Sequence, residues 1–214
     1  MMSILEDISQ NLQDGKAKTV KELVQKALDD GIGAETILNE GLLKGMDVIG
    51  GKFKRDEVYV PDVLIAARAM KAGTELLKPA LAMSGVKAVG KVVLGTVSGD
   101  LHDIGKNIVR MMMEGKGLEV IDVGVDVPAE KFIETAVSEN AQIIACSALL
   151  TTTMGEMKGV VEAAKKAGIR EKVTFMIGGA PITDTFCKSI GADIYTPDAA
   201  SAAEEAYKVC VKAT

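Results

Sequence analysis

Residues 91–107 read KVVLGTVSGDLHDIGKN, and this stretch decides the fold. Lys91–Val97 is a short apolar run rich in β-branched residues, which is typical of a buried strand. A polar, glycine-containing segment interrupts the run, and an amphipathic helical pattern begins at about residue 104. A strand, a loop and a helix therefore follow in that order, which is the first part of a βαβ unit.

The same alternation continues to the C-terminus. Further strands are expected at Leu118–Val123, Gln142–Cys146 and Val173–Ile177, with a weak fifth near Asp193–Tyr195. Helices are expected at about 104–116, 129–140, 155–168, 183–190 and 199–212. Right-handed crossovers then give an α/β domain with a parallel sheet covered on both faces. By analogy with other five-stranded doubly wound domains, we expect the strand order 2-1-3-4-5.

The N-terminal part reads as helices throughout, and four of them joined by short loops suggest a small bundle. Thr19 and Glu22 predict a capping box at the start of the second helix, which Asp30-Gly31 ends. Pro61 predicts the first turn of the fourth helix. Apolar residues at helical spacing mark the four segments, at about 4–12, 19–30, 34–49 and 61–77.

The two parts are separated by a segment in which the helical period ends. Pro79–Gly90 contains proline, serine and glycine, so we place the linker there. The expected domains are a helical cap at 1–84, a linker at 85–90 and an α/β domain at 91–214. Ser84-Gly85 and Gly90 have the backbone freedom expected of a hinge.

Composition narrows the classes of function. The chain has 214 residues, 26% of them charged, and a net charge of -5, which disfavours binding to nucleic acid. No apolar run approaches the ~20 residues of a membrane span, so we expect a cytoplasmic protein that does not bind membranes. Three widely spaced cysteines disfavour a disulfide scaffold or structural zinc, and the single histidine limits the catalytic possibilities.

Three loops are expected to converge on one site, because ligands of open parallel sheets bind beyond the carboxyl ends of the strands. In the first loop, Asp100-x-His102 suits a metal ligand whose second ring nitrogen is held by a carboxylate. The other two loops follow the third and fourth strands. Glycines would let a bulky flat ligand approach the backbone at Gly105, Gly178 and Gly179. Hydroxyl groups would satisfy the polar groups of that ligand at Ser147 and Thr151–Thr153.

Taken together, the three loops resemble those of the corrinoid (cobalamin-binding) methyl-carrier proteins of methyltransferase systems, of the methylamine, methanol and betaine type. Their pattern is D-x-H-x-x-G, then S-x-L, then G-G. Here Asp100–Gly105 is followed by Ser147-Ala148-Leu149 after 41 intervening residues (106 to 146) and by Gly178-Gly179 after 28 (150 to 177). The stretch 50–73, GGKFKRDEVYVPDVLIAARAMKAG, is similar to the cap that precedes the cobalamin domain of methionine synthase.

The resemblance implies a flavodoxin-like (Rossmann-like) cobalamin-binding domain in which His102 replaces the dimethylbenzimidazole of the cofactor as lower ligand of cobalt. It further implies that Asp100 orients His102 and that Thr153 hydrogen-bonds to Asp100. In the cap, Phe53 and Val60 would cover the upper face of the corrin. The remaining cofactor-binding residues would be Asp103, Ile104, Gly105, Ser147, Leu149, Thr151, Gly178 and Gly179.

The function implied by the resemblance is that of a methyl carrier and not of a complete enzyme. Methylcobalamin would form during turnover. The expected partners are a substrate:corrinoid methyltransferase, a corrinoid:tetrahydrofolate or coenzyme M methyltransferase, and a reductive activating protein. The donor could be a methylamine, a betaine, methanol, a thiol or an aryl methyl ether, because the partner binds it.

Several other classes fit less well. The glycine spacing is not the G-x-G-x-x-G of a dinucleotide site. Ala145-Cys146-Ser147 lacks the aspartate of a phospho-receiver domain, and a hydrolytic metal site would need more ligands. A cobalamin-binding subunit of a mutase shares D-x-H-x-x-G and stays an alternative, as does a B12-dependent sensor. The first should accompany a barrel domain and the second a DNA-binding module.

Overall fold

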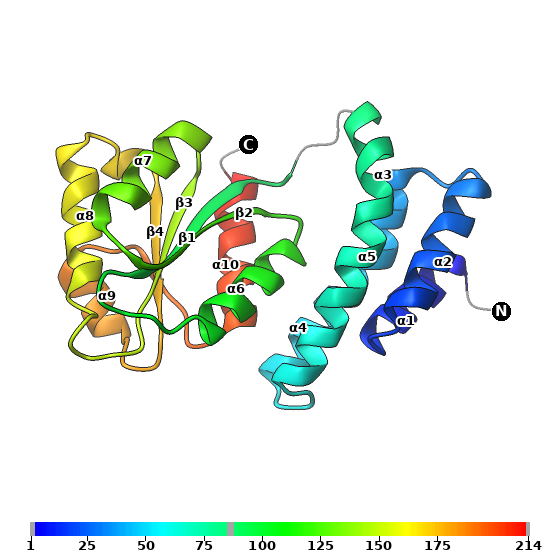
Figure 1. Ribbon diagram of the computed structural model, residues 1–214, viewed down its shortest axis with the longest axis horizontal. Coiled ribbons are helices and arrows are strands. Elements are labelled where there is room, and N and C mark those ends of the chain that lie inside the picture. The colour runs from blue at the N-terminus through cyan, green and yellow to red at the C-terminus, as the bar shows by residue number, and fades with distance from the viewer. Residues whose placement is uncertain (1–2, 85–87, 213–214) are drawn as a thin grey trace. The chain divides into compact units, whose positions relative to one another are not determined.

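The computed structural model describes residues 3–84 and 88–212, except for the side chains of residues 82 and 84. The chain divides into two compact units (Figure 1). The first comprises Met1–Ala88 with Gly115–Gly117, and the second comprises Val89–Glu114 with Leu118–Thr214.

The first unit is helical, as expected from its apolar periodicity. Ile8, Leu12, Val24 and Leu77 are among its fully buried side chains. A helical run without a break joins α3, a π-helical segment η1 and α4. The elements are α1 (Ile4–Gln13), α2 (Ala17–Asp29), α3 (Ala34–Thr36), η1 (Ile37–Leu43), α4 (Lys44–Lys54) and α5 (Val60–Ser84).

Two local predictions in this unit are wrong. Thr19 caps no helix, because α2 already begins at Ala17 and Thr19 lies in its first turn. The capping box is instead at α1, where Ser3 and Glu6 bond each other's backbone N–H groups.

Pro79 does not end the helical period, since α5 continues through it to Ser84. A proline removes one helical hydrogen bond, but packing of the flanking turns can override that loss.

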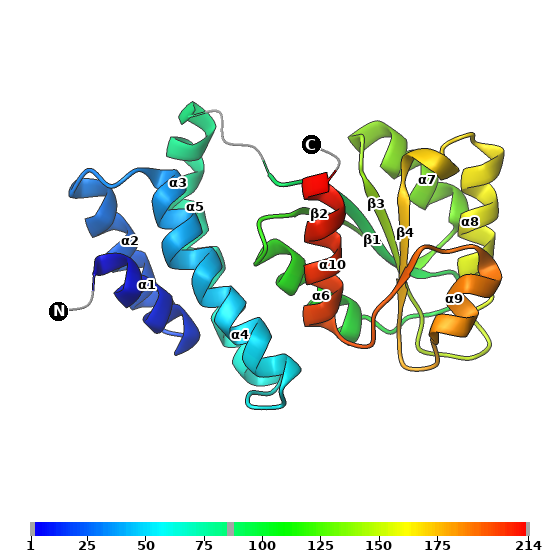
Figure 2. The ribbon, with the colours of Figure 1, turned by 180° about the vertical axis from the view of Figure 1, so that it is seen from behind.

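The second unit is a five-stranded parallel sheet in the expected order β2-β1-β3-β4-β5. Its strands are β1 (Lys91–Val97), β2 (Glu119–Val127), β3 (Ile143–Ser147), β4 (Thr174–Gly178) and β5 (Ile194–Tyr195). The helices between them are α6 (Ile104–Glu114), α7 (Ala129–Glu139), α8 (Glu156–Lys166), the short η2 (Arg170–Lys172), α9 (Asp184–Ile190) and α10 (Ala199–Lys212). Both ribbon views place α6 and α10 on one face of the sheet and α7 and α8 on the other (Figures 1 and 2).

Three strand ends differ from the prediction. Gly124 was expected to lie beyond the second strand, but β2 continues through it to Val127 and pairs with β1 on both sides of it. Ser147 and Gly178 were expected in loops and are instead the last residues of β3 and β4, where they pair with each other. Pairing with a neighbouring strand fixed these ends, and a single segment does not reveal that pairing.

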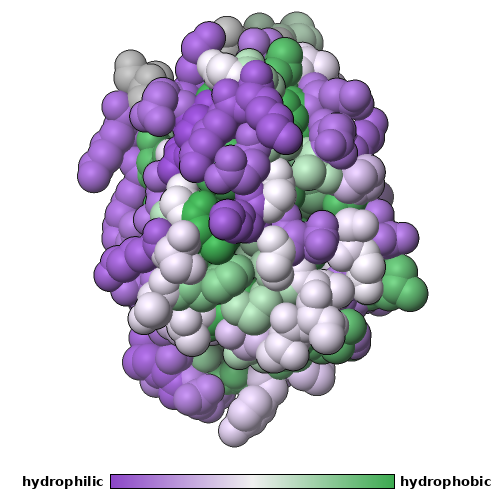
Figure 3. Space-filling model, turned by 90° about the vertical axis from the view of Figure 1, so that its left-hand side faces the viewer, coloured by the Kyte–Doolittle hydropathy of each residue, from purple (hydrophilic) through white to green (hydrophobic). Residues whose placement is uncertain are grey.

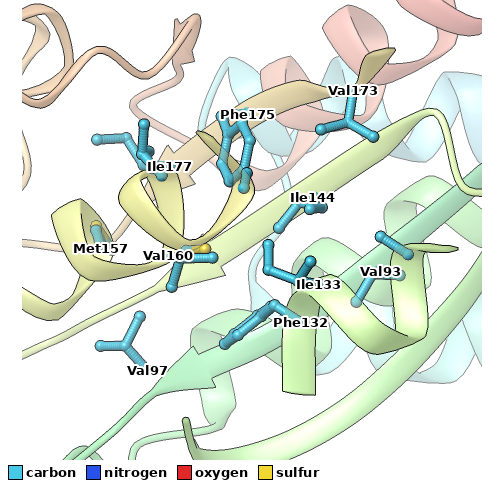
Figure 4. Packing of buried hydrophobic residues seen from close by; sticks show 14 of the residues in the cluster. Val93, Val97, Phe132, Ile133, Ile144, Met157, Val160, Val173, Phe175 and Ile177 are labelled. Atoms are coloured by element: carbon cyan, nitrogen blue, oxygen red, sulfur yellow. The ribbon is translucent and has the colours of Figure 1, made fainter. Parts of the chain in front are cut away.

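A cluster of buried apolar residues lies between the sheet and the helices α7 and α8. Figure 4 shows Phe132 and Ile133 of α7 facing strand residues, with Phe175 and Ile177 of β4 toward α8. Burying a phenylalanine fully is worth about 1.5–3 kcal/mol relative to leaving it exposed. The cluster therefore fixes the sheet on which the loops after β1, β3 and β4 are mounted.

The three cysteines are buried thiols, consistent with the expectation from their spacing. Burial in the apolar interior raises the pKa of Cys146 to about 12. Met112 and Met113 of α6 are buried in the core. No reactive thiolate or methionine site follows from these residues.

Gly90 was predicted to give a hinge its backbone freedom, but the structure gives another reason for a glycine at this position. A Cβ atom there would lie 2.3 Å from Cys210 Sγ of α10, so glycine is needed for close packing. Residues 85–87 lie outside the described part of the chain, and with them Gly85 of the predicted hinge.

Two surface properties bear on function. On the side turned toward the viewer in Figure 3, hydrophilic residues dominate and apolar residues appear as small separate areas. Within residues 3–84 and 88–212, no helix is both long and apolar enough to cross a membrane.

Candidate functional site

The loops that follow β1, β3 and β4 meet at the carboxyl edge of the sheet, which is the lower edge in Figure 1. Thr96 of β1 pairs with Ser147 of β3, and Ser147 pairs with Gly178 of β4. The next residue, Ala148, donates its N–H to Gly178 O at 3.2 Å. The expected convergence of the three loops is therefore present.

A buried carboxylate joins two of these loops. Asp100, in the β1–α6 loop, has no exposed surface. Its Oδ1 accepts hydrogen bonds from the backbone N–H of His102 at 3.1 Å and from His102 Nδ1 at 2.7 Å. Its Oδ2 accepts from the Thr153 hydroxyl at 2.8 Å and from the N–H groups of Leu149 and Leu150 at 2.8 and 3.2 Å. The hydrogen bond expected between Thr153 and Asp100 is thus present.

These donors keep Asp100 ionised. Burial alone would raise the pKa of the carboxyl group. Hydrogen bonds from the His102 ring, from the Leu149 N–H and from the Thr153 hydroxyl outweigh burial and hold the pKa of Asp100 well below its usual value. The site therefore contains a buried negative charge at neutral pH, directed at His102.

The carboxylate determines which way the imidazole faces. Because ionised Asp100 can only accept hydrogen bonds, Nδ1 of His102 is the donor in this contact, and Nε2 is the ring nitrogen that Asp100 leaves unused. The side chain of His102 is 51% exposed, whereas Asp100 is fully buried. Thr96 fixes the loop from below by donating its hydroxyl to His102 O at 2.9 Å. The arrangement presents a half-exposed imidazole, held through Nδ1, at the surface of the unit.

The three predicted glycines differ in what they do. Gly179 has φ 135°, and a Cβ atom would lie 1.8 Å from Ala148 O, so only glycine lets the β4 loop approach the β3 loop. A Cβ at Gly105 would meet nothing within 4 Å, and one at Gly178 would meet only Thr196 O at 3.9 Å. Gly105 and Gly178 therefore leave space open beside the site.

The other predicted residues of the second unit lie at the same edge. Leu149 and Thr151 are exposed on the β3–α8 loop, and Ser147 is half-buried at the end of β3. Asp103 accepts hydrogen bonds from the backbone and the side chain of Asn107, which secures the first turn of α6. Ile104 begins that helix with 73% of its surface exposed.

Phe53 and Val60 belong to the helical unit. Phe53 lies in the last turn of α4 and Val60 is the first residue of α5, and both are half-buried. The turn between them is exposed and contains the ion pair of Arg55 with Glu57. The two residues thus flank one end of the helical unit.

Sequence reasoning missed several groups. The amides of Leu149 and Leu150 leave no trace in a motif, because every residue has a backbone N–H. Lys106 is 3% exposed and forms an ion pair with Asp122 of β2, and a lysine among the apolar positions of α6 could have signalled this. Asp126, which bonds the β1–α6 loop, has no evident sequence signal.

The residues fit the cobalamin expected from the motif. Among the residues that the structure describes, no three His, Cys, Asp or Glu side chains form a metal-binding group. The one imidazole of the chain, that of His102, is therefore a single nitrogen ligand without protein partners at the metal. A corrin ring supplies the equatorial ligands of its own metal and needs one further nitrogen. Exposed apolar side chains suited to a large flat ring lie beside His102 and in the neighbouring β3–α8 loop. They are Leu101 just before α6 and Ile104 at its start, and Leu149 and Leu150 after β3.

Comparisons with known proteins agree with this chemistry. Residues 90–206 and 4–78 match two family models, each described as a B12 binding domain. A corrinoid protein of Desulfitobacterium hafniense is 41% identical over 99% of this chain and 100% of its own length. The dimethylamine corrinoid protein of Methanosarcina barkeri is 42% identical, with 95% of each chain covered. A chain of the methanol:cobalamin methyltransferase complex MtaBC from Methanosarcina barkeri superposes with a TM-score of 0.87 at 31% identity, covering 97% of this chain and 79% of that one.

Replacing Asp100 by asparagine should destabilise the protein in a pH-dependent manner. The pKa of Asp100 is lower when folded than when unfolded, so its contribution is present above the unfolded value of about 3.9 and is lost as the pH falls below it. At pH 7 we expect Asp100→Asn to lower the free energy of unfolding by about 2–3 kcal/mol, the scale of hydrogen bonds to a charged group.

Urea unfolding at pH 7 and pH 3 measures this difference. It should shrink at the lower pH, while Glu134→Gln on the exposed face of α7 should change little at either pH. An Asp100→Asn penalty that stays constant between the two pH values would contradict the assigned ionisation.

Proposed function

The chain belongs to the B12-binding corrinoid protein family, and from this premise we propose that it carries a methyl group on the cobalt of a bound corrinoid between two methyltransferases. The observation that carries the proposal is the arrangement of Asp100, His102 and Thr153, which presents one oriented imidazole at the carboxyl edge of the sheet.

The corrinoid supplies, when bound, a cobalt atom whose electron pair accepts a methyl group as the donor's leaving group departs and is recovered when an acceptor attacks that methyl group. The chain supplies the surroundings for this chemistry. His102 Nε2 would be the lower ligand, and Asp100 would hold the ring through Nδ1 at 2.7 Å. A carboxylate partner fixes the tautomer of a ligand histidine and raises its basicity. Thr153 in turn holds Asp100 at 2.8 Å.

The channel for the displaced nucleotide tail would use the remaining residues of the carboxyl edge. Gly105 and Gly178 leave the required space, since a Cβ atom at either meets no neighbour closer than 3.9 Å. Ser147 and Thr151 would offer hydroxyls, and Asp103, Ile104, Leu149 and Gly179 would complete the lining. Gly179 differs from the others because its packing against Ala148 already requires glycine.

Methyltransferases are the partners of this protein, in keeping with its membership of a family of methyltransferase components. We propose that one of them binds the donor and that the other serves tetrahydrofolate or coenzyme M. A reductive activating protein would restore cobalt that has been oxidised by one electron. The names of the compared proteins include dimethylamine and methanol, although both proteins are similar to this chain. We therefore propose that the partner, and not the corrinoid protein, selects the donor. The comparisons favour neither a mutase subunit nor a sensor.

Loading the protein with hydroxocobalamin tests the ligand. We expect one cobalamin per chain, and the electron paramagnetic resonance spectrum of the cobalt(II) form should show coupling to one imidazole nitrogen. That coupling should become coupling to ¹⁵N when the single histidine is ¹⁵N-labelled, because His102 is the only imidazole in the chain. His102→Ala should lose it. A spectrum unaffected by the label would contradict the assignment.

A transfer experiment tests the role of carrier. The loaded protein is reduced with titanium(III) citrate and treated with ¹⁴C-methyl iodide, so that iodide leaves and the label stays with the protein. After gel filtration, a coenzyme M methyltransferase of a methylamine system is added with coenzyme M. We expect labelled methyl-coenzyme M, and free cobalamin at the same concentration serves as the control. Labelled protein that passes no methyl group to coenzyme M or, in a parallel assay, to tetrahydrofolate would overturn the proposal.

For the helical unit we propose that Phe53 and Val60 shield the upper face of the corrin. Both are apolar and half-buried, and they flank an exposed charged turn. Phe53→Ala should leave the affinity for cobalamin within about twofold but accelerate photolysis of the methylated form, because the methyl group would lose its cover. Val48→Ala, which removes an exposed apolar side chain from the same helix, is the matched control. Equal photolysis rates in the two variants would make Phe53 an ordinary residue of the bundle.

A further inference from the structure

The end of β2 is irregular beside the site. Leu94 pairs with Asp122, Gly95 with Gly124, and Val97 with Val127. Between Leu94 and Gly95, and again between Gly95 and Val97, the paired stretch of β2 contains one residue more than that of β1. Two bulges therefore follow each other in β2. Bulges beside functional sites commonly redirect a side chain. The second bulge contains Asp126.

Asp126 has an unusual backbone conformation. Its φ is 52°, in the left-handed region that residues other than glycine rarely adopt. Such a conformation persists when surrounding contacts determine it, and it is found preferentially at functional sites. The contacts of Asp126 therefore indicate what the conformation is for.

The side chain of Asp126 and its backbone N–H both bind the loop that carries His102. Asp126 Oδ1 accepts the Gly99 N–H at 2.7 Å and lies 3.5 Å from the Ser98 hydroxyl. The backbone N–H of Asp126 donates to Asp100 O at 2.9 Å. Asp126 thus holds the two peptide groups that flank the Gly99–Asp100 bond, one through its side chain and one through its backbone.

A buried ion pair fixes the bulge itself. Lys106 Nζ lies 2.6 Å from both carboxylate oxygens of Asp122, and Arg110 donates to Asp122 Oδ2 at 3.1 Å. Asp122 Oδ1 also accepts the Gly124 N–H at 3.0 Å, within the first bulge. The first turns of α6 and the bulged end of β2 are therefore joined beneath the loop. The network fixes β2 at Asp122 and Gly124, just before Asp126. Asp126 in turn binds Gly99 and Asp100.

We propose that Asp126 is a positioning residue, which keeps the backbone at Gly99 and Asp100 in the one arrangement that presents Asp100 Oδ1 to His102 Nδ1. Its contribution to cofactor binding rests on the proposed function, whereas its contribution to the His102 tautomer concerns this chain alone. Without the Asp126 acceptor, Gly99 would lose its hydrogen bond, and the carboxylate of Asp100 would no longer be aimed at a single ring atom.

The test compares variants of the protein without cofactor by ¹⁵N NMR of the imidazole. The chain contains one histidine, so the signals belong to His102 alone. We expect the Nδ1–H tautomer to dominate at pH 8 in the unmodified protein. Asp126→Gly tolerates the backbone conformation but removes the acceptor, and should give a mixture of tautomers. Asp126→Asn keeps an acceptor oxygen and should restore the dominant tautomer.

The matched control is Asn140→Gly at the end of α7, another non-glycine residue with positive φ, 53°, which lies outside the loop contacts. In the loaded protein, Asp126→Gly should lower the affinity for hydroxocobalamin about tenfold or more, the scale found when groups supporting a metal ligand are removed. Asp126→Gly with unchanged tautomer and affinity would overturn the proposal. If the unmodified protein bound no cobalamin, the proposed function would fail, and the tautomer comparison would still decide the role of Asp126.

A measurement on the unmodified protein covers the case in which Asp126→Gly does not fold. Gly99 is exposed, yet its N–H is bonded to Asp126, so amide hydrogen exchange at Gly99 should be slow. Exchange at the rate of an unprotected surface amide would refute the contact on which the proposal depends.

Discussion

The site depends on a carboxylate that has been removed from water. A buried charge without partners is costly, so Asp100 is tolerated only because donors surround both of its oxygens. The donors come from the loops after β1 and β3, which must therefore lie close together whenever the protein is folded. The requirement to satisfy one charge thus fixes the relative position of two loops, and one of its donors is the imidazole that faces outward.

The same requirement explains why the surroundings are rigid. The β3 loop can donate two amides to Asp100 only if it turns directly after Ser147, and Gly179 lets β4 approach the turn where any side chain would collide with Ala148 O. Next to the β1–α6 loop, the contact between α6 and β2 is not wholly apolar, because it contains the Lys106–Asp122 ion pair. Lys106 contacts both oxygens of Asp122 at 2.6 Å, so the pair holds α6 and the end of β2 together beside the loop that carries His102.

A single oriented imidazole suits a protein that carries a cofactor and does not perform the chemistry alone. A carrier must hold its metal firmly and still leave the opposite face available in turn to different partners. His102, Asp100 and Thr153 all belong to the second unit, so the hydrogen bonds that orient the imidazole come from that unit. Family membership shows that the chain is a corrinoid protein of a methyltransferase system, and the division of labour that we propose assigns the substrates to its partner enzymes.

The sequence by itself determined the helical and strand segments and the residues of the motif, because apolar patterns act locally. The strand order was expected from analogy with other doubly wound domains, and the pairing of the strands confirms it. It placed Asp100, His102 and Thr153 in one site through their resemblance to a known pattern. It did not determine the true end of β2, the continuation of α5 through Pro79, or the amides of Leu149 and Leu150. Only the tertiary structure decided these, since strand pairing, packing around a proline and backbone donors depend on neighbours distant in the chain. Asp126 is the clearest case, because its conformation and its partners exist only where the bulged strand meets the loop.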